Sequence, residues 1–314
     1  MNDNKPTSGF VADIDDENDF NSTHHNGGFS NISEAYVSKS GFNRIFSAVR
    51  YGKRYMLKCL KPDFAYTPTY RQALMKEFEI GLQLDHPNIC RIISMEPVGE
   101  LGDCIVMEYV DGETLEAAVK GGNITEEKVR KIASQLLDAM EYMHAKQTVH
   151  RDIKPSNIML THRGGDVKLI DFGLSDSETF CVLKIPAGTI GYMAPEQLQP
   201  GAKSDPCADI YSFGKVLEYM AEAVRSKSLA RVGQKCAADE RDRRPADIAQ
   251  VRRLITGKGG SLAVVNAVLV VLALVLLVVI GVMMSSRQTA PTSTPPTDSA
   301  SVGATNKVID SSLW

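Results

Sequence analysis

One stretch of the sequence decides its fold: His150-Arg151-Asp152-Ile153-Lys154-Pro155-Ser156-Asn157, with Asp171-Phe172-Gly173 further along the chain. The first run has the spacing H-R-D-x-x-x-x-N, and the D-F-G that follows makes a chance match negligible. Asp152, Asn157 and Asp171 thereby present oxygen-bearing side chains at the spacing that a phosphoryl-transfer site needs. A buried polar turn is the alternative interpretation, but it does not account for both runs together.

The residue types of the two runs suit the separate tasks of phosphoryl transfer, which depends on positioning and charge neutralisation. Asp152 is expected to accept or orient the proton of the acceptor hydroxyl. Asn157 and Asp171 are expected to hold Mg²⁺, because amide and carboxylate oxygens suit a hard cation. Lys154 is expected to lie against the γ-phosphate, where its charge would stabilise the charge that develops during transfer.

The run from Asp152 to Asn157 resembles the catalytic loop of the serine/threonine protein kinase family, which reads D-x-K-P-x-N. The resemblance implies ATP as the phosphate donor, Mg²⁺ or Mn²⁺ as the cofactor, and the serine and threonine hydroxyls of proteins as acceptors. It also implies an α+β, two-lobed fold with a small β-rich N-lobe and a mainly helical C-lobe.

The resemblance extends to residues that would bind the phosphates of the nucleotide. Tyr55-Met56-Leu57-Lys58 matches the strand whose lysine contacts the α- and β-phosphates, which assigns that role to Lys58. The predicted helix from Arg71 to Leu84 contains Glu77, which matches the glutamate that pairs with this lysine and orients it. Glu79 is the competing choice for the same role.

A later segment resembles the strand and hinge behind the adenine in this family. It reads Ile105-Val106-Met107-Glu108-Tyr109-Val110. The match makes Met107 the gatekeeper and directs backbone groups of Glu108 and Val110 toward the base. The side chains alone would equally suit a plain core strand.

The loop that covers the phosphates departs from the family pattern G-x-G-x-x-G-x-V. The alignment puts Ser38, Ser40 and Asn43 at the glycine positions and Ile45 at the valine position, and it leaves Gly41 out of register. Glycine serves there because the backbone must approach phosphate closely and adopt unusual dihedrals. Serine is small and asparagine tolerates positive φ, so a weaker grip on the nucleotide is expected, with the chemistry intact.

Downstream residues match structural and regulatory positions of the family. Gly191-Tyr192-Met193-Ala194-Pro195-Glu196 resembles the A-P-E segment that closes the activation loop. Asp209 resembles the aspartate that anchors the catalytic-loop backbone, and Arg244 resembles the arginine that pairs with Glu196.

Thr189 matches a threonine that hydrogen-bonds the catalytic aspartate and lysine. Arg151 matches an arginine that often binds an activation-loop phosphate. The candidate acceptors of that phosphate are Ser175, Ser177 and Thr179.

Two further departures concern packing and length. Gly81, one helical turn after Glu77, stands where the family usually has a bulky apolar residue. This predicts a mobile helix that a partner or a modification would lock. Only 35 positions separate Asp209 from Arg244, so a shortened C-lobe that ends near Ile255 is expected.

Composition restricts the class of the protein further. The formal net charge of −3 over 314 residues gives no nucleic-acid signature. The cysteines lack C-x-x-C spacing, which fits free thiols in a reducing compartment better than disulfides or a zinc site. They stand at 59, 90, 104, 181, 207 and 236.

The first 30 residues show no helical or strand period, and their acidic run at 13–19 is expected to be a solvated tail. No cleavable secretory signal opens the chain.

Near the C-terminus, Leu262 to Met284 forms a run with Asn266 as its only strongly polar member. As a helix it would be about 34 Å long, which suffices to cross a bilayer. Arg252, Arg253 and Lys258 precede it and Arg287 follows it, so the positive-inside rule puts the larger, N-terminal part in the cytoplasm. Pairing of two copies in the membrane stays open, although the run has no strong small-xxx-small pattern.

The sequence therefore predicts a cell-membrane kinase that crosses the bilayer once, with an outward C-terminal tail, as in bacterial transmembrane serine/threonine kinases. Its parts are an N-terminal tail (1–31), a kinase domain (32–256), a juxtamembrane linker (257–261), a transmembrane helix (262–284) and a disordered tail (285–314). The main alternative is a pseudokinase that serves as a membrane-tethered scaffold, which the degenerate glycine loop and Gly81 favour. A small-molecule phosphotransferase is a third possibility, which the Lys154-Pro155 pair disfavours.

Overall fold

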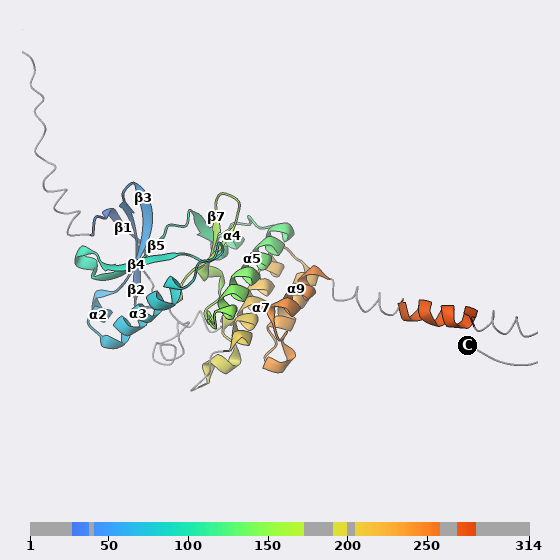
Figure 1. Cartoon of the computed structure of the whole chain (residues 1–314). Helices are drawn as coiled ribbons and strands as arrows, with labels where there is room; N and C mark the ends of the chain where they lie inside the picture. The colour runs from blue at the N-terminus through green and yellow to red at the C-terminus, as the bar shows by residue number, and fades with distance from the viewer. Residues whose placement is uncertain (1–26, 38–40, 173–190, 200–204, 258–268, 281–314) are drawn as a thin grey trace, which may run out of the picture. The chain divides into compact units, whose positions relative to one another are not determined.

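The structure is a computed structural model that describes residues 27–37, 41–172, 191–199, 205–257 and 269–280 (Figure 1). The chain divides into two units, Met1–Lys258 and Gly259–Trp314. The first unit begins with a β-sheet and continues into a mainly helical part. This arrangement agrees with the α+β, two-lobed fold that the sequence predicts.

The N-terminal part contains an antiparallel five-stranded sheet in the order β1-β2-β3-β5-β4. Its strands are β1 (Ser30–Val37), β2 (Asn43–Arg50), β3 (Lys53–Leu60), β4 (Ile92–Pro97) and β5 (Asp103–Glu108). Tyr51 and Gly52 join β2 to β3 with φ angles of 51° and 74°. Two positive φ values in a two-residue turn match the twist of a hairpin, so Arg50 pairs directly with Lys53.

Two helices follow β3, namely α2 (Pro62–Ala65) and α3 (Pro68–Leu82). Each begins with a proline, whose fixed φ and missing N–H suit the first helical turn. Helix α3 buries Ala73, Leu74, Glu77 and Gly81 on one side. A charged side chain on the buried side of a helix requires a partner, and the active site supplies one.

The second part is built from helices around a small three-stranded sheet in the order β6-β7-β8. Its strands are β6 (Gly112–Thr114), β7 (Ile158–Thr161) and β8 (Val167–Leu169), and its helices are α4 (Leu115–Lys120), α5 (Glu126–Ala145), α7 (Pro206–Ala223), α8 (Lys227–Cys236) and α9 (Ile248–Thr256). Short 3-10 helices are η1 (Gly99–Leu101), η2 (Pro155–Asn157), η4 (Pro195–Leu198) and η5 (Arg241–Arg243). Figure 1 shows α5, α7 and α9 side by side.

Helix α5 illustrates how the sequence specifies this part. The Thr125 hydroxyl accepts a hydrogen bond from the N–H of Lys128 and caps the helix, and Glu126 and Glu127 lie in the first turn. Apolar residues then recur every three to four positions and form one buried face. They include Val129, Ile132, Ala133, Leu136, Leu137, Met140 and Met143. This face belongs to a core that is continuous from β3 and β5 to α7 and α9.

The other face of the N-terminal sheet has a separate core, which includes Phe29, Phe46, Leu57 and Val106. Phe29 is fully buried there, and β1 already begins at Ser30. Residues 29–31, which precede the predicted domain start at residue 32, thus already contribute to this sheet and its core. The reason is that an aromatic side chain just before the first strand completes this core.

Helices α7 and α8 cross closely, and the crossing accounts for the short spacing between Asp209 and Arg244. A β-carbon added at Gly214 would lie 2.6 Å from the backbone nitrogen of Ala237 and 2.7 Å from the carbonyl oxygen of Gly233. Only a residue without a side chain permits this approach. Residues 224–226 alone connect α7 to α8, so the stretch between α7 and Arg244 contains α8, the 3-10 helix η5 and short connections.

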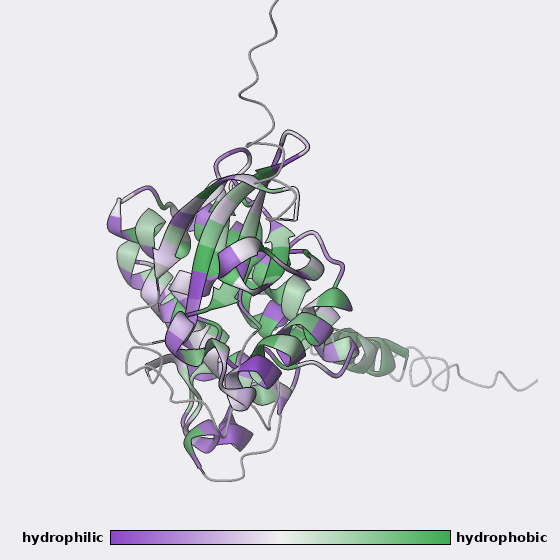
Figure 2. Ribbon diagram, turned by 90° about the vertical axis from the view of Figure 1, so that its left-hand side faces the viewer, coloured by the Kyte–Doolittle hydropathy of each residue, from purple (hydrophilic) through white to green (hydrophobic). Residues whose placement is uncertain are grey.

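The second unit is described at residues 269–280, which are helical. Every residue of this helix is exposed, and its large residues are all leucine, isoleucine or valine. The helix is therefore coloured as hydrophobic along its whole length in Figure 2. Among the residues described, no helix is both long enough and apolar enough to span a membrane.

Candidate active site

The first part of the site is a buried group of one lysine and two carboxylates. The ammonium group of Lys58, on β3, lies 2.5 Å from Oε1 of Glu77 on α3 and 2.8 Å from Oδ1 of Asp171. Lys58 and Glu77 are almost completely buried, whereas the Asp171 side chain is 41% exposed. The structure thus brings Lys58, Glu77 and Asp171 together from three separate segments.

Glu79, the competing choice, lies elsewhere. Its carboxylate is half exposed and accepts a hydrogen bond of 3.3 Å from Lys76 on the same helix. The difference follows from helical periodicity, because positions 77 and 79 lie on different faces of α3. Glu77 shares the buried side with Leu74 and Gly81 and therefore points at the sheet.

The two carboxylates stabilise the charge of Lys58, although burial outweighs the effect of Lys58 on Glu77 and raises the pKa of Glu77. Burial by itself would lower the pKa of Lys58, but the charges of Asp171 and Glu77 outweigh burial and raise the pKa well above its ordinary value. Lys58 therefore remains an ammonium ion in the apolar interior. A fixed cation suits the phosphates of a nucleotide.

The second part of the site is the catalytic loop. Nζ of Lys154 lies 2.6 Å from Oδ2 of Asp152, and Nδ2 of Asn157 donates to the same oxygen at 2.9 Å and to the carbonyl oxygen of Asp152 at 3.0 Å. Two donors therefore fix one carboxylate oxygen. Oδ1 of Asp152 is buried and accepts no hydrogen bond from any described residue.

A buried carboxylate oxygen without a donor is costly unless a ligand completes it. Burial raises the pKa of Asp152, and the charge of Lys154 counteracts this effect. A carboxylate with a raised pKa takes up a proton more readily than an ordinary one. Because Asp152 is held through one oxygen, its other oxygen can take or orient a hydroxyl proton.

The loop owes its shape to Asp209, at the beginning of α7. Oδ2 of Asp209 accepts the backbone N–H of His150 at 2.9 Å, and Oδ1 accepts that of Arg151 at 2.8 Å. These contacts hold Arg151 at a φ of 67°, a conformation that is strained for a residue with a side chain. The anchoring role that the sequence assigned to Asp209 thus has a direct geometric counterpart.

A further contact to Asp209 was not predicted from the sequence. Nε2 of His144, in the last turn of α5, lies 2.9 Å from Oδ2 of Asp209. Burial would raise the pKa of Asp209, but His144 and the surrounding N–H donors outweigh it and hold the pKa below its ordinary value. A histidine near a helix C-terminus was the available signal, but its partner is 65 residues away.

The catalytic loop is also joined to the segment that contains Asp171. Nε2 of His150 lies 3.3 Å from the carbonyl oxygen of Ile170, and the rings of His150 and Phe172 are 5.3 Å apart. Asp171 itself has a φ of 69°. A positive φ at a residue with a side chain, as at Arg151 and Asp171, is a strained backbone conformation. Such strain is common in active sites, where the surrounding contacts enforce it.

Asn157 and Asp171 are the residues predicted to hold Mg²⁺, and their donor atoms fit a hard cation. Because Nδ2 of Asn157 is committed to Asp152, its amide oxygen is the atom that would face a cation. No group of three or more His, Cys, Asp or Glu side chains among the described residues could hold a metal by itself. A cation here would need phosphate oxygens to complete its coordination, as Mg²⁺ commonly does.

The hinge segment lies at the end of β5. Met107 pairs with Met56 and Glu108 with Tyr55 across β3. The Glu108 N–H donates to the carbonyl of Arg91, and its carboxylate lies 2.6 Å from Nζ of Lys168. Among the described residues, neither the N–H nor the C=O of Val110 has a backbone partner. The backbone at Val110 is thus available to hydrogen-bond an adenine ring.

The glycine-loop positions are described in part. Ser38 and Ser40 lie outside the described residues. Asn43 begins β2 and pairs with Leu60, and Ile45 pairs with Lys58. Asn43 does not have a positive φ. The tolerance of asparagine for positive φ is therefore not used at position 43, because this residue is already part of the strand.

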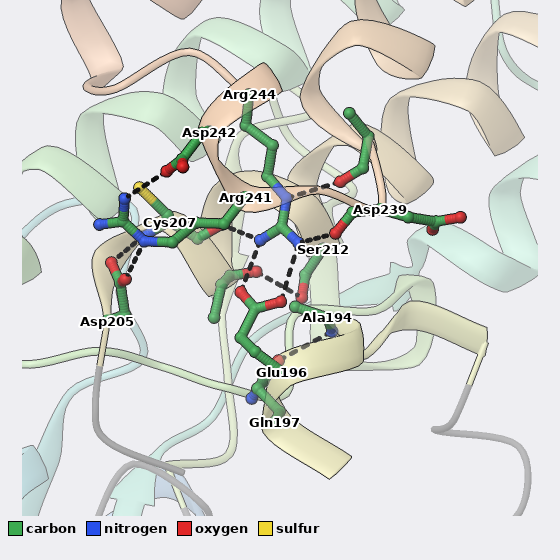
Figure 3. A network of polar contacts seen from close by, with 12 residues as sticks. Ala194, Glu196, Gln197, Asp205, Cys207, Ser212, Asp239, Arg241, Asp242 and Arg244 are labelled. Atoms are coloured by element: carbon green, nitrogen blue, oxygen red, sulfur yellow. Dashed lines mark hydrogen bonds and ion pairs between the residues drawn. The ribbon is translucent and has the colours of Figure 1, made fainter. Parts of the chain in front are cut away.

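Figure 3 shows the network of polar contacts around Arg244 and Glu196. The Arg244 guanidinium is completely buried and binds the Glu196 carboxylate through two nitrogens, at 2.6 and 2.8 Å. It also donates to the backbone carbonyls of Ala238, Cys207 and Asp239. This is the pair that the sequence assigned to a structural role.

Gln197 connects this network to the catalytic loop, and no sequence pattern predicted this contact. Its amide oxygen accepts the N–H of Ala194 at 3.0 Å, and its amide nitrogen donates to the carbonyl of Arg151 at 3.3 Å. Thr189 and the candidate phosphate acceptors Ser175, Ser177 and Thr179 lie outside the described residues.

Gly81 is the remaining site-related departure. A β-carbon there would lie 2.2 Å from Cδ1 of Ile92 on β4. The Ile92 side chain thus occupies the space beside α3 that a larger residue at position 81 would fill. Both residues are buried, so the missing side chain is compensated from the sheet.

Comparison with known proteins supports this interpretation of the site. A family model described as the protein kinase domain matches residues 39–247. The chain is 33% identical over 195 residues to a probable serine/threonine-protein kinase, SCO3848, of Streptomyces coelicolor, which covers 58% of this chain and 28% of that protein. It is 40% identical over 174 residues to mitogen-activated protein kinase kinase 9 of Arabidopsis thaliana, covering 52% of this chain and 53% of that one.

A third relative is the serine/threonine-protein kinase PrkC of Bacillus subtilis, which is 36% identical over 167 residues. That match covers 51% of this chain and 25% of PrkC. The chain thus spans from a quarter to about half of the length of these three relatives. Residues 39–247, which the family model matches, include Lys58, Glu77, Asp152, Asn157 and Asp171.

Proposed function

Because the chain belongs to the protein kinase family, we propose that it transfers the γ-phosphate of ATP to serine or threonine hydroxyls of proteins. The observation that best supports this function is the convergence of two groups. Lys58, Glu77 and Asp171 form one, and Asp152, Lys154 and Asn157 form the other. All the tasks of phosphoryl transfer are thereby assigned to side chains.

The order of events follows from these contacts. Lys58, oriented by Glu77, binds the phosphates of ATP, and backbone groups near Val110 bind its base. The acceptor hydroxyl approaches Oδ1 of Asp152, which takes or orients its proton. Lys154 remains beside Asp152 and stabilises the negative charge that develops on the transferred group.

Asn157 and Asp171 are the side chains that would hold Mg²⁺, which neutralises phosphate charge when it is bound. Asp171 is partly exposed while it contacts Lys58. It can therefore serve a cation on one side and the lysine on the other. The residues present fit this cofactor without any further ligand from the protein.

Serine and threonine are the proposed acceptors because of Lys154 and because two of the relatives are named serine/threonine-protein kinases. The test is to offer matched peptides that contain a single serine, threonine or tyrosine, together with small alcohols, to the full-length protein. Transfer to the serine and threonine peptides is expected. Transfer to the small alcohols alone would overturn the proposal in favour of a small-molecule phosphotransferase.

The rival function is a pseudokinase that binds partners without turnover. The substituted glycine positions favour it, because Ser38, Ser40 and Asn43 replace flexible residues at the phosphates. The intact set of catalytic side chains argues against it. A nucleotide-binding measurement in parallel with the transfer assay separates the two, because the rival requires binding without product.

We also propose that residues 262–284 anchor the protein in the cell membrane, with the kinase domain on the cytoplasmic side. Support comes from the run of apolar residues and from residues 269–280, which are helical and exposed throughout. An exposed helix whose large side chains are all aliphatic has no favourable environment in water. Arg252, Arg253 and Lys258 before the run support the orientation.

Regulation by autophosphorylation is proposed on the basis of Arg151. Its backbone is fixed by Asp209 and Gln197, so its position depends on the same network as the catalytic loop. A phosphate on Ser175, Ser177 or Thr179 would gain charge-assisted hydrogen bonds from such an arginine. Mass spectrometry after incubation with ATP tests this proposal, and absence of phosphate between Ser175 and Thr189 would contradict it.

A further inference from the structure

A groove of about 790 Å³ lies at one end of the N-terminal sheet, and its lining includes Glu108 and Tyr109 of the hinge but not Lys58, Asp152 or Asp171. It forms where β3 begins, β5 ends, and the segment after α3 leads into β4. Two of its lining residues, Leu82 and Ile93, are large apolar side chains with 52% and 39% exposure. The first unit thus presents an apolar surface that its own described residues do not cover.

The same groove carries a concentration of positive charge. Lys53, Arg54 and Arg91 line it and are exposed. Neither Lys53 nor Arg91 forms an ion pair with any residue that the structure describes. Arg54 has only a contact of 3.8 Å with the exposed Asp111 and a position over the Tyr109 ring.

Two carboxylates also line the groove, but they do not cancel this charge. The Glu108 carboxylate is committed to Lys168 at 2.6 Å and accepts the N–H of Arg91 at 3.0 Å. Asp85 is therefore the one acidic side chain of the lining that has no cationic partner among the described residues. Three cations and an apolar wall favour an occupant that is both acidic and hydrophobic.

The described chain begins on the same sheet as this groove, close to the last residue of β4. Gly27 lies next to β4, because a β-carbon there would be 3.5 Å from the carbonyl oxygen of Pro97. Phe29 contacts the ring of Tyr55 at 5.9 Å, and Tyr55 itself lines the groove. The residues before Gly27 therefore start near Pro97, at the end of β4 opposite to Ile92 and Ile93.

Those preceding residues have the required chemistry. The segment 10–20 reads Phe-Val-Ala-Asp-Ile-Asp-Asp-Glu-Asn-Asp-Phe, with acidic residues at 13, 15, 16, 17 and 19. Phe20 precedes Gly27 by seven residues, which can span up to about 24 Å. The six residues of β4 span only about 20 Å. The tail can thus reach the groove from its point of attachment.

We propose that this groove binds the chain's own acidic and hydrophobic segment, residues 10–20. The Phe20 ring would lie against Leu82 and Ile93, and the carboxylates would face Lys53, Arg54 and Arg91. Individual exposed ion pairs are weak. A short tether raises the local concentration of the segment to about the millimolar range, so weak contacts suffice in the same molecule.

Docking in this place would connect two parts of the kinase. Leu82 ends the helix that carries Glu77, and Glu108 ends the strand that leads to the adenine. A segment bound across both would restrain α3 relative to the hinge. This inference does not depend on catalysis, and its test therefore does not use activity.

The test places a photo-crosslinking amino acid, p-benzoylphenylalanine, at position 20 of the full-length protein. Crosslinks are expected within one molecule and on the peptide that contains residues 82–93. The double variant Lys53→Glu, Arg91→Glu should lower their yield about fivefold. The matched control Lys227→Glu, Arg231→Glu changes two exposed cations of α8 by the same charge and should leave the yield unchanged.

A charge exchange completes the design. Replacing Asp15, Asp16 and Glu17 by lysine in the Lys53→Glu, Arg91→Glu background should restore the crosslinks. Failure of this restoration, or equal loss in the α8 control, would overturn the proposal. Crosslinks between two differently tagged copies would also overturn it, because they would assign the groove to a second molecule. Since all altered groove residues are exposed, thermal unfolding should remain unchanged in these variants.

Discussion

At the scale of single residues, the site is organised around charges that are buried but paired. Lys58 is held by two carboxylates, and the Asp152 carboxylate is held through one oxygen by Lys154 and Asn157. The other oxygen of Asp152 has no donor among the described residues. The protein thus leaves open the one acceptor at which the proposed hydroxyl would lose its proton.

Lys154 is the residue whose removal should separate binding from chemistry. Lys154→Ala is expected to lower kcat by about a hundredfold or more, because the lost charge acts on the transition state. KM for ATP should change little, since Lys58 holds the phosphates. Steady-state kinetics of the full-length protein measure both, with Lys154→Arg as the control that keeps the charge. A raised KM with unchanged kcat would assign Lys154 to binding instead.

The Arg244 and Glu196 pair should affect stability in a pH-dependent manner. Burial raises the pKa of Glu196, but Arg244 outweighs this and holds the pKa below its ordinary value. The stabilisation is therefore present above the unfolded-state pKa, about 4.3, and is lost as pH falls through the lower folded-state pKa. At pH 7, Glu196→Gln should cost roughly 3 kcal/mol, because it leaves Arg244 buried without a counter-charge.

Urea unfolding of the wild type and Glu196→Gln at several pH values checks this expectation. The difference in the free energy of unfolding should be largest near neutral pH and should shrink below about pH 4. A difference that stays constant over the whole range would mean that shape, and not charge, determines the contribution of Glu196.

Residues differ in how far the sequence alone could locate them. The catalytic-loop residues and Asp171 are fixed by spacing along the chain, so the sequence predicted a site from them. Gln197 and His144 act through contacts with the carbonyl of Arg151 and the carboxylate of Asp209. Such contacts join distant parts of the chain, and no local pattern reports them.

At the scale of elements, α3 and β4 have adjusted to one another. Glycine in a helix costs about 1 kcal/mol relative to alanine. The Ile92 side chain nevertheless requires it, since a β-carbon at position 81 would lie 2.2 Å from Cδ1. The sequence indicated a mobile helix from Gly81 alone. The structure adds that the Ile92 side chain fills the gap beside Gly81. The sequence of α3 alone does not predict this, because Ile92 lies on β4.

Gly81→Ala should therefore destabilise the protein by about 1 to 3 kcal/mol, because the cost of overpacking exceeds the gain in helix propensity. Ile92→Val removes the clashing methyl and by itself should cost about 1 kcal/mol. The double variant should be more stable than the sum of the two effects predicts. Chemical denaturation of all four proteins gives the coupling energy, and strict additivity would show that Ile92 does not fill the space beside Gly81.

Some features of the helices and strands follow from local sequence, and others depend on contacts between distant segments. The turn at Tyr51 and Gly52, the prolines that begin α2 and α3, and the period of α5 all follow from local sequence. The close approach of α7 and α8 does not, because it depends on Gly214 and Gly233 meeting from different helices. Spacing between Asp209 and Arg244 indicated a shortened region but not how it is packed.

At the scale of the whole molecule, the proposed anchor determines where the kinase would act. Each of the substitutions Leu274→Arg and Val278→Arg should cost about 3 kcal/mol of the free energy of membrane insertion, if the residue lies at the centre of the span. The doubly substituted protein should therefore leave the membrane pellet after alkaline extraction of cells, whereas the wild type remains. The same exchange at Tyr51 and Tyr66, which are exposed on the first unit, is the control. Wild-type protein in the supernatant would contradict the anchor.

The central claim is that the buried constellation around Asp152 performs phosphoryl transfer to proteins. The most direct measurement incubates the full-length protein with γ-labelled ATP, Mg²⁺ and a protein acceptor, in parallel with Asp152→Asn. This substitution keeps the size of the side chain and removes the proton acceptor. Labelled serine or threonine is predicted for the wild type, with a loss of at least about a hundredfold in the variant. Equal labelling by both proteins, or none by either while both bind ATP, would contradict the account.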